Sequence, residues 1–149
     1  MTRRKDMTMS NKIIAVFMGL LFLPMAYAAS IQGRWVTIDD KTGKKRAVVY
    51  LNESNGRLSG TIQKVYKQAG DTGVCSKCPG RFKNKPIKGL TFLWGLKKKD
   101  ANTYSGGKIL DPKSGKIYRA KVTRKGNKLY VRGYVGVSML GRTQVWVRN

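Results

Sequence analysis

The sequence contains no histidine, and only 7 of its 149 residues are acidic. Histidine is the commonest general base in enzymes, so its absence removes the usual means of moving a proton at neutral pH. Four of the acids, Asp39, Asp40, Asp100 and Asp111, fall in predicted turns, where aspartate accepts hydrogen bonds from the backbone. We therefore predict that the protein is not an enzyme and has no catalytic residue and no cofactor.

Long apolar runs are also absent, apart from one near the start, at Ile13–Leu23. Bases precede this run, Pro24 ends it, and Ala26 and Ala28 then form a small-x-small cleavage pattern, which is typical of a secretory signal peptide. We predict a signal peptide over residues 1–28, cleaved after Ala28, and a single domain over 29–149 in the periplasm or secreted. An uncleaved signal anchor is the alternative, and Met7 or Met9 are alternative starts.

Cysteine is scarce too: Cys75 and Cys78 are the only two, in a Cys-x-x-Cys motif. An exported protein meets an oxidising environment, which favours a disulfide between them. A thioredoxin-type redox pair would instead need a helix N-terminus to lower the thiol pKa, and Pro79 and Gly80 follow the motif directly. A zinc site needs about four ligands. The chain could supply them only with carboxylates or a second molecule, so we predict no metal site.

Basic residues are what the sequence has in excess, with 31 Lys and Arg. Such a positive field attracts polyanions and speeds their encounter. In a bacterial envelope, the anions at hand are lipid headgroups and polysaccharides, so both are candidate partners. The bases are spread along the chain, which is typical of a solvated basic surface as well. We expect no specific nucleic-acid partner and at most a peripheral contact with the membrane.

After residue 28, no window shows apolar residues at helical spacing for three turns. Short runs rich in β-branched and aromatic residues alternate with turn residues instead. The eight runs are 32–39, 46–53, 57–66, 90–98, 104–110, 117–124, 128–135 and 142–148. We predict an all-β fold, a small antiparallel up-and-down β-barrel of about eight strands, with a two-sheet sandwich as the alternative. Residues 67–89, rich in Gly, Pro and Lys, are expected to fold over one end of the barrel.

Alternation along the last two runs does not decide which side chains face the barrel interior. One set of alternating positions is polar and aromatic, and the other is aliphatic, so one of them faces inward. The first set is Tyr130, Arg132, Tyr134, Arg142, Gln144 and Trp146, and the second is Leu129, Val131, Val135, Thr143, Val145 and Val147. A polar and aromatic interior would form a lined cavity, whereas the aliphatic interior, which is favoured, would form a filled core.

Several short motifs follow one another in a specific order. They are Gly33-x-Trp35, Lys85–Leu90, Trp94–Leu96, Ser105–Pro112, Gly115–Tyr118, Val131–Gly136 and Gly141–Trp146. The Gly-x-Trp motif resembles the opening of lipocalin-type barrels, and the whole series is similar to the bacterial domain of unknown function DUF2147. The resemblance covers essentially the whole of residues 29–149. It implies a lipocalin-like, calycin-type barrel that is exported and has no agreed biochemical role.

The resemblance also implies roles for three residues. In lipocalin-type barrels, the tryptophan of Gly-x-Trp closes one end of the barrel, and an arginine from the last strand packs over it. Gly33, Trp35 and Arg142 are the matching residues here, and all three are expected to be structural. A guanidinium stacked on an indole contributes roughly 0.5–2 kcal/mol.

Three functional hypotheses follow. The first is a carrier or sensor that binds a small apolar or amphiphilic ligand at the barrel mouth, between residues 67–89 and the aromatic residues Phe92, Trp94, Tyr104 and Tyr134. The second is an interaction module whose basic exterior binds anionic envelope lipids or polysaccharides. The third is a thiol-disulfide protein that acts through Cys75 and Cys78. The first is preferred, by analogy of fold.

Overall fold

A computed structural model describes residues 29–137 and 141–149 of the protein. The predicted signal peptide, residues 1–28, lies outside the described residues. No helix within the described ranges has the length and apolar character needed to cross a membrane.

Eight strands and one short 3₁₀ helix form the described chain. They are β1 (Gly33–Ile38), β2 (Lys45–Ser54), β3 (Arg57–Val65), η1 (Gly80–Phe82), β4 (Thr91–Lys98), β5 (Thr103–Leu110), β6 (Ile117–Lys125), β7 (Lys128–Tyr134) and β8 (Gly141–Arg148). Each predicted run coincides with one strand to within a residue at either end. Turn residues explain this agreement. Asn55 and Gly56, for example, both have positive φ, at 50° and 71°, as a two-residue hairpin turn requires.

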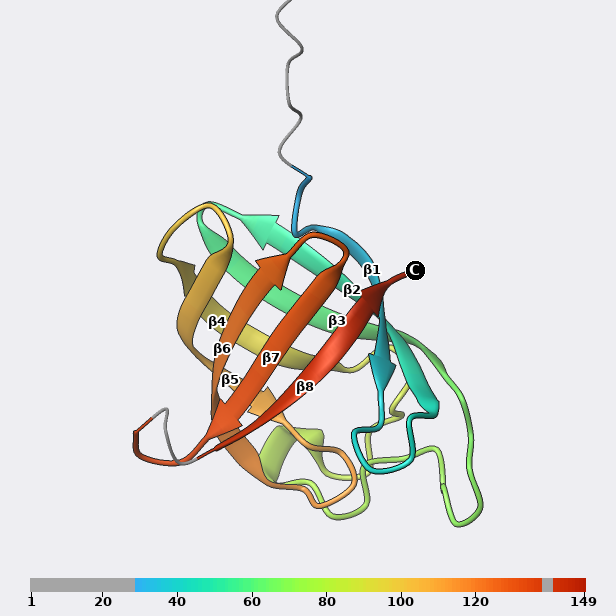
Figure 1. The fold of residues 1–149 in the computed structure, drawn as a ribbon. Helices are drawn as coiled ribbons and strands as arrows, with labels where there is room; N and C mark the ends of the chain where they lie inside the picture. Colours follow the sequence, from blue (N-terminus) through green and yellow to red (C-terminus); the bar gives the residue numbers. More distant parts are fainter. Residues whose placement is uncertain (1–28, 138–140) are drawn as a thin grey trace, which may run out of the picture.

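The strands pair in sequence order, and β8 pairs with β1 to close the barrel (Figure 1). All eight pairings are antiparallel, which confirms the predicted up-and-down barrel and excludes the sandwich. At the seam, Trp35–Thr37 pair with Trp146–Arg148, so closure covers part of both edge strands.

In each of the last two strands, β7 and β8, one set of alternating side chains faces the barrel interior. Leu129 pairs with Trp146 and Val131 with Gln144, so these four side chains point to the same side. Leu129, Val131 and Trp146 are buried, whereas Val145 is 36% exposed. The prediction that the aliphatic set faces inward is therefore correct for β7 and wrong for β8. The register between the two strands, which periodicity does not contain, decides the outcome.

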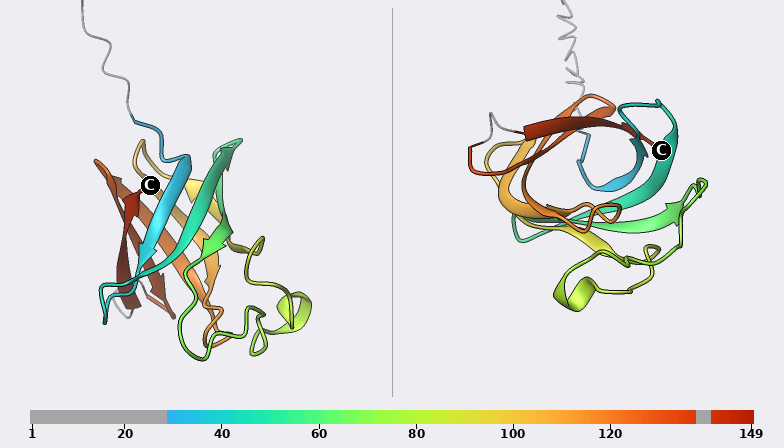
Figure 2. Two further views of the ribbon diagram at one scale, coloured as in Figure 1. Left: turned by 90° about the vertical axis from the view of Figure 1, so that its right-hand side faces the viewer. Right: turned by 90° about the horizontal axis from the view of Figure 1, so that it is seen from below.

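The two ends of the barrel differ in their connections. At one end, the β2–β3, β4–β5 and β6–β7 turns are short; we call it the Trp35 end, because Trp35 lies there beside Arg148. The other end carries the β1–β2, β3–β4, β5–β6 and β7–β8 connections, and we call it the loop end. Residues 66–90 lie at this end, as expected, but they lie beside the ring of strands and not across it (Figure 2, right).

Candidate functional site

Trp35 closes its end of the barrel together with Arg148. Both side chains hold the segment that precedes β1, and we call this arrangement the clamp. Its side chain is fully buried, and its Nε1–H donates a hydrogen bond to the Ile31 carbonyl at 2.9 Å. The Arg148 guanidinium lies 4.1 Å from the centre of the Trp35 ring and donates hydrogen bonds to the carbonyls of Gln32 and Ser30. Gly33 has φ 126°, and a Cβ there would lie 3.0 Å from the Arg148 guanidinium. Trp35 and Gly33 therefore contribute to the closure, as the resemblance implied.

Arg142 does not pack over Trp35, and the assignment of this role to Arg142 was wrong. Arg148 occupies the position, because Trp35 pairs with Arg148 in the β1–β8 register. Arg142 lies at the opposite end of β8, where its guanidinium forms an ion pair with Asp40 of the β1–β2 turn. Both arginines face the same side of the strand, so only the register separates them.

Tyr104 belongs to the same end as Trp35 and is engaged within the chain. It is buried, and its hydroxyl donates a hydrogen bond to Glu53 Oε2 at 2.6 Å. Lys98 Nζ lies 3.3 Å from Glu53 Oε1. The Tyr104 hydrogen bond is the main cause of a lowered Glu53 pKa, with Lys98 contributing, while burial and the Glu53 carboxylate raise the pKa of Tyr104.

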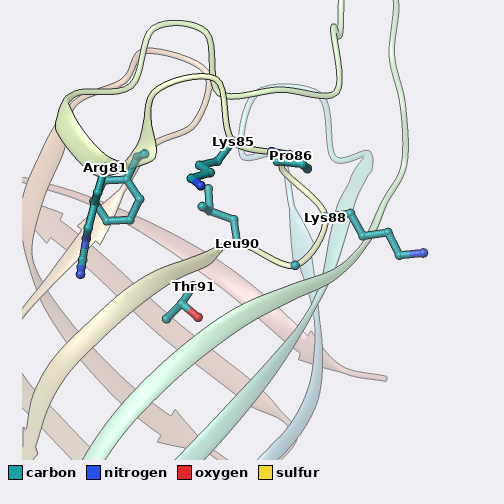
Figure 3. A pocket seen from close by; sticks show the side chains of 8 residues that line it. Arg81, Lys85, Pro86, Lys88, Leu90 and Thr91 are labelled. Carbon is teal, nitrogen blue, oxygen red and sulfur yellow. The ribbon is translucent and has the colours of Figure 1, made fainter.

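At the loop end, a hollow of about 400 Å³ lies between η1, the residues that follow it and the start of β4 (Figure 3). Its lining combines three bases with apolar side chains. The bases are Arg81, Lys85 and Lys88, and the apolar residues include Phe82, Pro86 and Leu90. Lys85 lies over Leu90, and the side chain of Lys88 extends away from the others (Figure 3).

Arg81 is held in place by aromatic rings. Its guanidinium lies 4.7 Å from the centre of the Phe82 ring and 5.7 Å from that of Trp94. The Phe82 and Trp94 rings are themselves 5.4 Å apart, so η1 is packed onto β4. These contacts restrict Arg81 before any ligand arrives.

The loop carrying the hollow is fixed by a disulfide and by a close backbone approach. Cys75 and Cys78 form the predicted disulfide, and both are buried. Gly115 of the β5–β6 turn has φ 74°, and a Cβ there would lie 1.8 Å from the Lys77 carbonyl oxygen. Only glycine allows this approach, so the β5–β6 turn and the Cys-x-x-Cys segment pack together.

Every described acid is already engaged, and none with the bases of the hollow. Asp40 and Glu53 are paired as described above, and Asp71 lies 3.6 Å from Arg46. Asp39, Asp100 and Asp111 accept backbone N–H bonds within their own turns, as predicted for turn residues. Among the described residues, no group of three or more His, Cys, Asp or Glu is arranged to hold a metal ion.

The four predicted ligand residues do not line one site. Phe92 is buried against Trp146, with ring centres 5.9 Å apart, and Tyr104 lies at the opposite end of the barrel. Tyr134, at the end of β7, is partly buried and pairs with Arg119 and Gly141. Trp94 contacts the side chains of Arg81 and Phe82, which line the hollow. It packs on the outside of β4, because the β3–β4 register shifts next to it.

A second hollow, of about 480 Å³, also lies outside the barrel, between the β1–β2 turn and residues 66–69. Its lining includes Lys44, Lys45, Tyr66 and Lys67. The first hollow is not predicted by the sequence pattern, because its residues come from an irregular segment. The signal that could have found it is the close spacing of Arg81, Phe82 and Lys85.

Comparison with known proteins agrees with this architecture. Protein HP1028 from Helicobacter pylori, described as belonging to the lipocalin family, has a similar structure, with a TM-score of 0.70 and 23% sequence identity. The match covers 81% of this chain and 84% of that one, and shows a shared fold. No curated protein matches the sequence significantly. The family model for DUF2147, an uncharacterized protein conserved in bacteria, matches residues 33–148, and the chain therefore belongs to the DUF2147 family.

Proposed function

We propose that this protein is an exported, non-enzymatic barrel that binds a small amphiphilic ligand with an anionic headgroup in the hollow at the loop end. One observation carries the proposal: Arg81 and Lys85 lie beside apolar side chains, with Lys88 at the margin, and no described acid neutralises these bases. The ligand class follows from this pairing of charge with apolar surface.

The hollow suits such a ligand in size and preorganisation. Small-molecule sites typically measure roughly 300–1000 Å³, and this one, at about 400 Å³, is at the small end. A guanidinium can donate two parallel hydrogen bonds to a carboxylate or phosphate. Because Phe82 and Trp94 already restrict Arg81, binding loses little side-chain entropy. An alkyl chain would lie over Phe82, Pro86 and Leu90.

The barrel interior offers less support for a ligand. Large side chains occupy it, among them the fully buried Trp35, Trp146, Leu51 and Leu93. Many small barrels are filled by their own side chains in this way. The proposed site therefore differs from the mouth site expected from sequence. The signal peptide predicted over residues 1–28 supports the proposed location in the periplasm or outside the cell, where lipids are available.

Titration calorimetry with three probes tests the proposal: dodecyl phosphate, dodecyl maltoside and inorganic phosphate. Dodecyl phosphate should bind best, because it alone combines an anionic head with an apolar tail. The double variant Arg81→Gln/Lys85→Gln should weaken its binding about tenfold or more, since charge-assisted hydrogen bonds contribute about 1.5–3 kcal/mol each.

Lys44→Gln/Lys45→Gln is the matched control, because it removes the same charge from the second hollow. Its affinity for dodecyl phosphate should stay close to that of the parent. Equal binding of dodecyl maltoside, or an equal loss in the two double variants, would show that the hollow is not the site.

A further inference from the structure

Bases also gather on the outer surface of the barrel, on strands that do not line the hollow. In β6, Ala120 and Val122 are buried, so Arg119 and Lys121, which alternate with them, point outward and are exposed. The register places further exposed or partly exposed bases around these two. We call the whole set the basic face: Arg57, Lys97, Lys108, Arg119, Lys121 and Arg132.

Within the basic face, like charges stand directly opposite one another. The opposed pairs are Arg57 with Lys97, Lys108 with Arg119, and Lys121 with Arg132. Opposed like charges on one face of a sheet are destabilising. The described strands β4, β5, β6 and β7 contain no acid that could offset this repulsion. An external anion would relieve it.

Two residues next to Lys121 could affect the charge of the basic face. Asp100, in the β4–β5 turn, is mainly occupied by the backbone N–H of Asn102, which lowers its pKa more than Lys121 does. Arg132 is already engaged, since it donates a hydrogen bond to Thr143. Lys108, Arg119 and Lys121 are therefore the bases from which the proposal is argued.

An apolar rim borders the basic face at the loop end. It consists of Ile117 at the start of β6, and Val135 and Val137 after the end of β7. These side chains are 38%, 66% and 60% exposed. Since β6 pairs with β7, the three lie at the same edge of the sheet. In Figure 1 this edge is at the lower left, where β7 ends and β8 begins.

We propose that the basic face is a docking surface for an anionic lipid bilayer, with the apolar rim entering the headgroup region. Juxtaposed bases and exposed aliphatic side chains are the two features that strengthen peripheral binding to such a membrane. Each base near an anionic surface contributes about fivefold to affinity. The basic face shares no lining residue with the hollow, although Lys108 pairs with Trp94, which packs against Arg81 and Phe82. Arg81→Gln/Lys85→Gln leaves the basic face intact, so either proposal can fail alone.

The aromatic residues near the face favour a bilayer over a nucleic acid. Single-stranded nucleic acids bind basic grooves in which exposed aromatic rings stack on the bases. Here, Lys125 lies 5.3 Å from the centre of the Tyr130 ring, and Arg81 and Phe82 pack on Trp94. The rings of Tyr130 and Trp94 are thus engaged within the chain, whereas the rim side chains are 38% to 66% exposed.

Vesicle flotation of the secreted protein tests the proposal. Vesicles of phosphatidylcholine mixed with phosphatidylglycerol should bind the protein, and vesicles of phosphatidylcholine alone should not. The triple variant Lys108→Gln/Arg119→Gln/Lys121→Gln should bind about a hundredfold more weakly. Its thermal stability should equal or exceed that of the parent, because opposed like charges have been removed. Val135→Ser/Val137→Ser should weaken the binding that remains at high salt.

Lys41→Gln/Lys44→Gln/Lys45→Gln is the control, because it lowers the net charge of the protein by the same amount. Its three substitutions lie at the β1–β2 turn, on the opposite wall of the barrel. It should retain most of the vesicle binding. An equal loss in both triple variants would mean that only overall charge matters and would overturn the proposal. Equal affinity for soluble glycerophosphate, or tighter binding to a single-stranded oligonucleotide than to vesicles, would overturn it as well.

Discussion

The two ends of the barrel treat their charged groups differently. At the Trp35 end, Arg148 is bound to two backbone carbonyls and stacked on an indole, and Glu53 is held by Tyr104 and Lys98. At the loop end, Arg81 and Lys85 border a hollow without any described acid. Charges satisfied within the chain stabilise the fold, whereas unsatisfied ones are available to a partner. Ion pairs also occur at the loop end, between Arg142 and Asp40 and between Arg46 and Asp71. The bases of the hollow are therefore the exception at that end, and the contrast assigns structure to the Trp35 clamp and binding to the hollow.

The largest expected effect is at the Trp35 end. Trp35→Ala should lower the free energy of unfolding by about 3–5 kcal/mol, because it empties a fully buried site. Urea unfolding of the variant and the parent measures the difference. A loss of less than about 1 kcal/mol would contradict the structural role of this end.

At the loop end, Gly115→Ala should lower the free energy of unfolding by about 3 kcal/mol, which is less than the loss expected for Trp35→Ala. The substitution strains a residue of positive φ and drives a Cβ into the Lys77 carbonyl. Gly126→Ala is the matched control, since Gly126 also has positive φ but open space around its Cβ position, and should lose only about 1 kcal/mol. Proteolysis within residues 67–89 should accelerate only in the Gly115 variant. Equal losses in the two variants would show that the close approach is unimportant.

Tyr104→Phe should lower stability by about 1–2 kcal/mol near neutral pH, because it removes a hydrogen bond to a partly exposed carboxylate. The native Glu53 pKa lies below its unfolded value. Its contribution is therefore complete above the unfolded pKa and is lost as pH falls through the native pKa. Urea unfolding across acidic pH should show parent and variant converging. Tyr130→Phe should show no such convergence.

Arg142→Ala should have the smallest effect, below about 0.5 kcal/mol, because its side chain is 55% exposed and its ion pair with Asp40 is screened by water. Arg148→Ala should lose several times more, since it removes the stacking on Trp35 and both carbonyl contacts. Thermal unfolding of the two variants compares them directly. The reverse order would restore Arg142 to the closing role.

Turn chemistry explains why the strands could be predicted and the site could not. Asn55 and Gly56 mark a hairpin by their own backbone preferences, so the strand ends are local properties. The choice between Arg142 and Arg148 is not local, because both face the same side of β8 and only pairing with β1 separates them. Periodicity likewise places Phe92 and Trp94 on one face.

Irregular strand pairing and irregular loop structure explain why the positions of Phe92 and Trp94 and the hollow were not predicted. The shift in the β3–β4 register puts Phe92 inside the barrel and Trp94 outside, which alternation cannot foresee. The hollow is built from η1 and the residues after it, whose conformation depends on a disulfide and on Gly115 rather than on any repeat.

The clamp around Trp35 also determines how the molecule can be attached to a surface. Arg148 holds the carbonyls of Ser30 and Gln32, and the Asn149 N–H donates a hydrogen bond to the Arg34 carbonyl at 3.1 Å. The first described residues and the last one therefore leave the barrel at the same end (Figure 1). A sensor chip linked through Asn149 would be joined to the Trp35 end of every molecule, so Arg81 and Lys85 would lie at the end away from the point of attachment.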